Sequence, residues 1–173
     1  MSLFLPDGYY KDIYTIDYKK LKKQGIKYLL FDFDNTIIEM NKYRYTKKHD
    51  ELFKTLKKDF NIAVISNTTN KEKIENFTKK CGIEYILLAL KPLKRGFKRV
   101  IKNNNLKSEE ICMIGDQLVT DVYGAKRMHI KAILVDRINN EELPLTRLNR
   151  RIEKRILKKL DRDYNFKKGV YYD

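Results

Sequence analysis

Residues 26–36 read Ile26-Lys27-Tyr28-Leu29-Leu30-Phe31-Asp32-Phe33-Asp34-Asn35-Thr36. The apolar first half predicts a buried strand near 26–32, which ends by presenting two carboxylates and a hydroxyl. In an open parallel sheet, ligands bind at the carboxyl ends of the strands. One aspartate there could attack a phosphorus while the other moves the proton of the leaving group. The chain is therefore a candidate phosphoryl-transfer enzyme; the alternative is an acidic turn that caps the next segment.

A second apolar run, 62–65, is followed by Ser66 and Asn67. A helical pattern comes next, and we expect its N-cap at Thr69 or Asn70. A hydroxyl and amide hydrogens at a helix N-terminus form an anion site. Simple capping of the helix is the alternative.

Two later runs also end on polar residues. Lys91 follows the run 87–90, where its point charge could neutralise a phosphate oxygen, unless it is only one lysine of many in a basic chain. The run 111–115 ends in a glycine and is followed by Asp116, with Asp121 five residues further on. Because Mg²⁺ prefers oxygen ligands, Asp116 would complete a magnesium site. Asp121 could orient Asp116 or Lys91, or merely favour the dipole of the next helix.

These four elements, in this order, resemble the four sequence motifs of the haloacid dehalogenase (HAD) superfamily of aspartate-nucleophile phosphatases. Asp32, Asp34 and Thr36 match the first motif, Ser66 the second, Lys91 the third, and Asp116 and Asp121 the fourth. The chain looks closer still to one branch, the YqeG-type subfamily IIIA phosphatases. That similarity spans nearly the whole chain and adds Leu5-Pro6-Asp7, Asn35, Lys91-Pro92-Leu93, Gln117 to Thr120 and the basic stretch Thr146-Arg147-Leu148-Asn149-Arg150-Arg151-Ile152-Glu153.

The resemblance implies a role for each motif residue in a Mg²⁺-dependent phosphatase. Asp32 would be the nucleophile that forms an aspartyl-phosphate, and Asp34 would protonate the leaving oxygen and then activate water. The implied metal ligands are Asp32, Asp116 and the backbone carbonyl of Asp34. Ser66, Asn67 and Lys91 would bind the phosphate, with Thr36 bonded to the loop of the first motif and Asp121 in support.

The resemblance also implies a substrate class. Some proteins of this type act as phosphatidylglycerophosphate phosphatases, so we expect an anionic lipid headgroup. The alternatives are a HAD phosphatase that acts on nucleic-acid ends or phosphoproteins, and a non-enzymatic RNA-binding protein with the same fold. The complete set of Asp32, Asp34, Lys91 and Asp116 argues against the non-enzymatic alternative.

Strands and helices alternate along the chain. We expect strands near 26–32, 60–66, 85–90, 110–115 and 130–136, with helices near 46–58, 70–81, 93–104 and 117–128. This order predicts an α/β fold, a HAD-like (Rossmann-like) parallel sheet of about five strands with helices on both faces. We expect one domain over 1–173, with a core of about 26–136 and with 1–25 and a basic helical tail, 141–168, as extensions. The connections leave no room for a cap domain, so the site should be open.

The chain has 173 residues and a formal net charge of +15, which favours anionic partners. Between 147 and 168 there are ten basic and three acidic residues. Apolar side chains at 145, 148, 152, 156 and 160 share one helical face, and Arg147, Arg150, Arg151, Lys154, Lys158 and Arg162 lie opposite. This basic amphipathic helix could dock on the sheet, lie on anionic lipid, or bind nucleic-acid phosphates; we rank nucleic acid below the membrane.

The N-terminus has no basic segment followed by a long apolar one, and no run of 18 or more apolar residues occurs. We therefore expect a cytoplasmic protein, with the inner face of the membrane as the place where it would bind peripherally. His49 and His129 follow no strand in a motif, so we expect both to be structural or exposed.

Overall fold

The computed structural model describes residues 2–40, 42, 45–139 and 144–173, with the side chains of 144–151 left out. Its six strands form one parallel sheet in the order β1-β6-β5-β2-β3-β4. They are β1 (Gly8–Tyr10), β2 (Tyr28–Phe31), β3 (Asn61–Ile65), β4 (Glu84–Ile86), β5 (Ile111–Gly115) and β6 (Lys131–Val135). The parallel sheet confirms the expected α/β fold, with one strand more than the sequence suggests.

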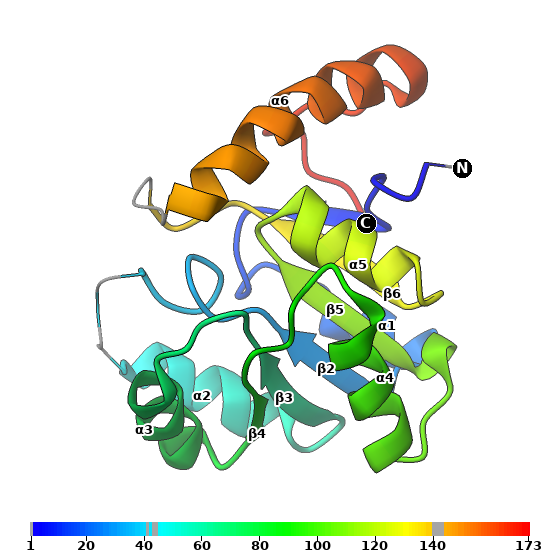
Figure 1. The fold of residues 1–173 in the computed structure, drawn as a ribbon. Helices are drawn as coiled ribbons and strands as arrows, with labels where there is room; N and C mark the ends of the chain where they lie inside the picture. Colours follow the sequence, from blue (N-terminus) through cyan, green and yellow to red (C-terminus); the bar gives the residue numbers. More distant parts are fainter. Residues whose placement is uncertain (1, 41, 43–44, 140–143) are drawn as a thin grey trace.

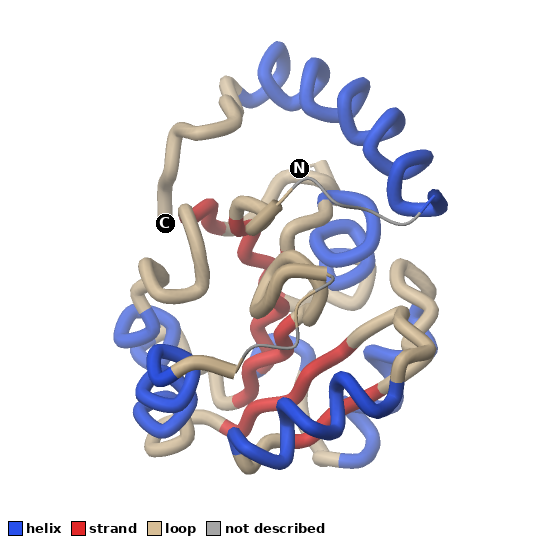
Figure 2. The backbone as a smooth tube through the Cα atoms, turned by 90° about the vertical axis from the view of Figure 1, so that its left-hand side faces the viewer, coloured by secondary structure: helices blue, strands red, loops and turns tan. Residues whose placement is uncertain are grey.

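Helices cover both faces of the sheet (Figures 1 and 2), as expected. One apolar core joins the sheet to α1 (Tyr18–Lys23), α2 (Lys47–Leu56) and α3 (Lys71–Cys81). A second core joins the opposite face to α4 (Lys94–Asn103), α5 (Tyr123–Lys126) and α6 (Pro144–Tyr164). A short 3₁₀ turn (Ser108–Glu110) precedes β5, and a π-helical turn (Leu118–Val122) precedes α5. The central strands are therefore buried on both sides, which explains their almost wholly apolar composition.

The sixth strand, β1, comes from the segment 1–25 that the sequence assigns to an extension. It pairs with β6, and Tyr9 at its centre is fully buried, with its hydroxyl donating to Asp136 at 2.5 Å. The end of the chain returns to the same strand, because Tyr172 forms an antiparallel bridge with Tyr9. The returning segment thus covers a strand edge that would otherwise be unpaired.

The expected tail helix is present as α6 and docks on the sheet domain. Leu160 and Glu153 are buried, and the backbone N–H of Val119 donates to Glu153 Oε1 at 3.3 Å. Ile152, expected on the apolar face of this helix, is 45% exposed. Figure 2 shows α6 lying across one end of the molecule. The side chains expected on the two faces of this helix at 145, 147, 148, 150 and 151 are not described. Residues 141–143 of the expected tail also lie outside the described residues.

The connections at the carboxyl edge of the sheet are short. In the described residues, the chain between β2 and β3 holds α2, and the chain between β3 and β4 holds α3. Neither connection carries a further element that could close over the strand ends. Among the described helices, none combines the length and the apolar character that a bilayer span requires.

Candidate active site

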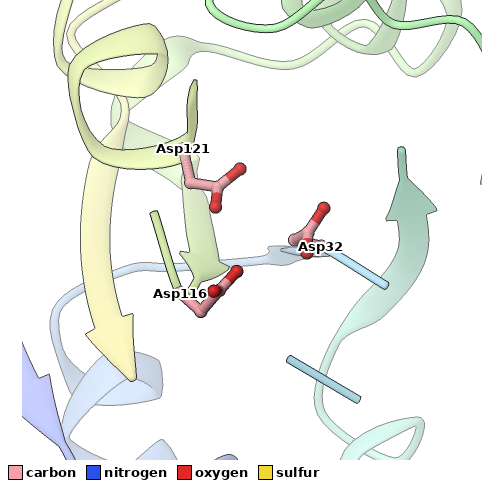
Figure 3. A group of neighbouring side chains, drawn as sticks. All are labelled: Asp32, Asp116 and Asp121. Atoms are coloured by element: carbon pink, nitrogen blue, oxygen red, sulfur yellow. The ribbon is translucent and has the colours of Figure 1, made fainter. Parts of the chain in front are cut away.

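The two central strands bring the first and fourth motifs together. β2 and β5 are neighbours in register, with Phe31 opposite Ile114, so Asp32 and Asp116 leave the sheet side by side. Figure 3 shows the carboxylates of Asp32, Asp116 and Asp121 directed into one space. One oxygen from each of these three buried groups lies within 4.8 Å of the others. The pairing of β2 with β5 thus brings two aspartates that are distant in the sequence, Asp32 and Asp116, into one acidic cluster with Asp121.

Asp121 reaches this cluster through the π-helical turn that follows β5. In this wide turn, Asp121 Oδ2 accepts a hydrogen bond from the backbone N–H of Gln117 at 3.1 Å. Asp121 Oδ1 accepts from Lys91 Nζ at 2.7 Å. Gly115 makes this possible, because a Cβ there would lie 2.3 Å from Asp121 Oδ2. Of the roles left open for Asp121, contact with Lys91 is the one that the structure displays. The expected continuous helix over 117–128 is divided into the π turn and α5.

Lys91 lies five residues beyond β4, in a loop that folds back over the end of β3. Asn67 holds the loop with two bonds to the Lys91 backbone: its Nδ2 donates to the carbonyl at 2.8 Å, and its Oδ1 accepts from the N–H at 2.7 Å. The Ala89 N–H also donates to the Ser66 carbonyl. The side-chain amide of Asn67, expected to bind phosphate, is therefore engaged in positioning Lys91.

The Lys91 ammonium bridges Asp32 and Asp121, donating to Asp32 Oδ1 at 2.6 Å and to Asp121 Oδ1 at 2.7 Å. Burial alone would lower the pKa of Lys91, but attraction to both carboxylates raises it above the ordinary value. Burial raises the pKa of Asp32; Lys91 opposes this effect, and the charges of Asp121 and Asp116 add to it. Counted at their formal charges, three carboxylates and one ammonium leave two negative charges in a buried cluster. A divalent cation would neutralise that charge, and oxygen ligands suit a hard cation.

Two hydroxyl groups lie at the same edge. Thr36 Oγ1 is 3.2 Å from Asp32 Oδ2 and 3.5 Å from Asp116 Oδ1, so its proton serves one of the two carboxylates. Ser66 is buried, and its Oγ accepts from the Thr68 N–H at 3.1 Å. The proton of Ser66 takes no part in that bond. The expected bond of Thr36 within the first-motif loop is therefore present, and Ser66 lies at the end of β3 beside β2.

The carboxylate of Asp34 is bonded to a lysine of α3. Lys73 Nζ donates to Asp34 Oδ1 at 2.6 Å and also to the Met40 carbonyl. The Lys73 side chain is 4% exposed, and its backbone N–H is held by the N-cap side chain of Asn70. Asn70 is thus the N-cap of α3, one of the two candidates. Sequence reasoning missed Lys73, and only its place three residues after that cap could have distinguished it from the other lysines.

His49 has a structural role, as expected. Its ring is buried, and the Thr46 N–H donates to Nδ1 at 3.1 Å, which leaves Nε2 to donate to the Ile37 carbonyl at 3.1 Å. Burial lowers the pKa of His49. The neutral ring therefore ties α2 to the loop that follows Asp34.

Comparisons with known proteins identify the family of the chain. The profile of a family described as mitochondrial PGP phosphatase matches residues 1–139. A probable phosphatase of Bacillus subtilis, YqeG, is 37% identical over 162 residues, which cover 93% of this chain and 94% of the relative. The phosphatidylglycerophosphate phosphatase 1 of Arabidopsis thaliana, chloroplastic/mitochondrial, is 27% identical over 90% of this chain, which spans only 47% of that protein.

Solved structures show the same fold. The HAD-type hydrolase YfnB of Bacillus subtilis, determined bound to magnesium, aligns with 69% of this chain and 91% of its own at a TM-score of 0.50 and 13% identity. At that identity the likeness speaks for the fold alone. The family match and the Bacillus relative YqeG carry the assignment: the chain belongs to the PGP phosphatase family and is a phosphatase that acts on a phosphorylated substrate.

Proposed function

We propose that the protein hydrolyses phosphomonoesters through an aspartyl-phosphate on Asp32. The observation that carries this proposal is the position of the Asp32 carboxylate. It ends a central strand, is buried, and is held by Lys91 on one oxygen and by Thr36 on the other. Such a carboxylate is fixed in one orientation before substrate arrives, which favours attack on a phosphorus placed beside it.

Each step uses a group of this chain. One oxygen of Asp32 attacks the phosphorus, the bond from phosphorus to the ester oxygen breaks, and Asp34 gives its proton to that oxygen. Asp34 then takes a proton from the water that attacks the phosphorus, which releases inorganic phosphate and restores Asp32. Lys91 and the hydroxyl of Ser66 would bind phosphoryl oxygens. Lys73 would position Asp34 through the 2.6 Å bond between them.

The resident cation would be Mg²⁺, held by Asp32, Asp116 and the backbone carbonyl of Asp34. The net double negative charge of the buried cluster supports this choice, as does the purely oxygen character of its donors. When bound, Mg²⁺ would supply positive charge to the phosphoryl oxygens. Asp121 remains on Lys91 in this arrangement, where it orients the ammonium.

The substrate would be an anionic lipid headgroup such as that of phosphatidylglycerophosphate, reached by a protein that binds the membrane peripherally. The family and the name of the Arabidopsis relative support this substrate. So do the uncovered strand ends and the formal net charge of +15. An open site suits a phosphate that is presented at a lipid surface and cannot be enclosed.

Phosphate release from a panel of substrates tests the proposal. Purified protein with Mg²⁺ is offered phosphatidylglycerophosphate in vesicles, 5′-phosphorylated oligonucleotides, a phosphopeptide and p-nitrophenyl phosphate. We expect the highest kcat/KM on the lipid, and loss of turnover on all four substrates in Asp32→Asn. A preference for the oligonucleotide or the peptide would contradict the lipid assignment, and full turnover by Asp32→Asn would contradict the mechanism.

A further inference from the structure

The loop between β4 and α4 carries an exposed apolar surface beside the active site. Leu88, Leu90 and Leu93 are 56%, 47% and 52% exposed, whereas Ala89 and Lys91 between them are buried. The loop therefore turns Lys91 inward to Asp32 and turns its leucines out to solvent. We call these three leucines the leucine tip.

Local backbone physics favours polar residues at these positions. Leu88 and Leu90 have φ angles of 49° and 53°, in the left-handed region where asparagine and glycine are favoured. Leu93 is the N-cap of α4 and makes no side-chain cap bond, although serine, threonine, aspartate or asparagine would supply one. None of the three leucines is buried, so packing in the core does not offset these unfavourable local choices. Residues that go against the local backbone preference and gain no packing are typical of functional positions, here of contact with a binding partner.

Basic side chains follow the leucine tip directly. The exposed face of α4 consists of Lys94, Arg95, Lys98, Arg99 and Lys102. Within the described part of the chain, no ion pair joins any of the five to an acidic group. Phe97 and Val100 on the other face enter the core, which fixes the direction of the charges. We call this face the α4 basic face.

We propose that the leucine tip and the α4 basic face form the surface by which the protein docks on an anionic lipid bilayer. The leucines would enter the acyl boundary and the basic groups would meet the anionic headgroups, an arrangement typical of interfacial binding. Because Lys91 lies between two of these leucines, docking would bring headgroup phosphates to the site. This inference rests on the proposed lipid substrate and specifies how that substrate is reached.

A lipid surface fits these observations better than a nucleic acid does. Single-stranded nucleic acids are bound by stacking of bases on aromatic rings within a basic groove. The tip offers three aliphatic side chains and no ring. The leucine tip and the α4 basic face belong to other elements than α6, whose docking on the domain uses Leu160 and Glu153.

Vesicle binding by matched variants tests the docking surface. Wild-type protein should co-sediment with phosphatidylglycerol vesicles and not with phosphatidylcholine vesicles. The double variant Leu88→Asn/Leu93→Ser should bind roughly 100-fold more weakly, about tenfold per leucine, while its Tm stays the same or rises. The control Leu3→Asn alters another leucine, 43% exposed, and should bind as wild type does.

A fluorescence measurement keeps the test independent of variant stability. The chain has no tryptophan, so Leu93→Trp provides a single tryptophan whose emission can be excited apart from that of the tyrosines. Its emission should shift to shorter wavelength on phosphatidylglycerol vesicles, whereas that of Leu3→Trp should not. An unshifted Leu93→Trp, wild-type binding by the double variant, or binding to RNA without binding to vesicles would each overturn the docking surface. Turnover of p-nitrophenyl phosphate under any of these outcomes would leave the proposed chemistry standing.

Discussion

Removal of the Lys91 ammonium gives a sharp test of the buried charge cluster. Lys91→Met keeps much of the length of the side chain and deletes the charge that bridges Asp32 and Asp121. The three side chains are 2%, 10% and 1% exposed, so water cannot replace the lost partner. Breaking a buried ion pair by removing one member typically costs about 3–5 kcal/mol. Since two carboxylates lose their partner here, we expect a loss toward the upper end of that range.

Urea unfolding of the metal-free protein in EDTA at neutral pH measures this loss. With a typical m-value of about 2 kcal/mol per molar urea, the midpoint should fall by roughly 2 M. The effect should shrink as the pH falls, because protonation removes the charge of the unpaired carboxylates. Added Mg²⁺ should stabilise Lys91→Met more than wild type, since three carboxylates then remain without an internal cation.

The matched control is Lys20→Met, which breaks the ion pair with Asp173. Those two side chains are 41% and 51% exposed, so water solvates the remaining carboxylate and little change is expected. A midpoint shift in Lys91→Met no larger than in this control would refute the view that Lys91 neutralises a buried acidic cluster.

Three further predictions follow from single contacts. Gly115→Ala brings a methyl group within 2.3 Å of Asp121 Oδ2, so it should displace that carboxylate and lower kcat/KM by about 10²-fold with little loss of secondary structure by circular dichroism. Because burial lowers the pKa of His49, the unfolded state takes up the proton first as the pH falls through about 6.5. Wild-type stability should therefore decline there, by at most about 1.4 kcal/mol per pH unit, and His49→Gln should flatten that decline in urea titrations at several pH values. Lys73→Met should release Asp34 and reduce kcat/KM more for alkyl phosphates than for p-nitrophenyl phosphate, whose leaving group needs no proton; equal losses would contradict a positioning role.

The sequence was sufficient to predict the core of the fold and to place Asp32 and Asp116 at neighbouring strand ends. Short apolar runs that alternate with helical patterns predict a parallel sheet, and polar residues at their ends must meet at one edge. Asp32 and Asp116 converge for that reason, whereas Lys91 also needs the loop that Asn67 holds over the end of β3. The pairing of Asp121 with Lys91 was one of several open roles, because the sequence does not reveal a π-helical turn.

Other features depend on contacts that leave no local pattern. β1 has three residues, too few to display an alternation, and Tyr9 is buried only because β6 and the end of the chain pair with it. Lys73 cannot be distinguished by type in a chain with 38 lysines and arginines. The left-handed backbone at Leu88 is likewise invisible in the sequence, since leucine is not a residue that signals it.

Chemical trapping of Asp32 tests the central claim most directly. The protein is mixed with excess substrate and Mg²⁺, quenched in acid within a turnover, and reduced with borohydride, which converts an acyl phosphate of aspartate to homoserine. Peptide mapping should then find homoserine at position 32 and nowhere else, and Asp34→Asn, in which hydrolysis of the intermediate is slowed, should accumulate more of it. Turnover at the full rate with unmodified Asp32, in wild type and in Asp34→Asn alike, would contradict the nucleophilic role of Asp32.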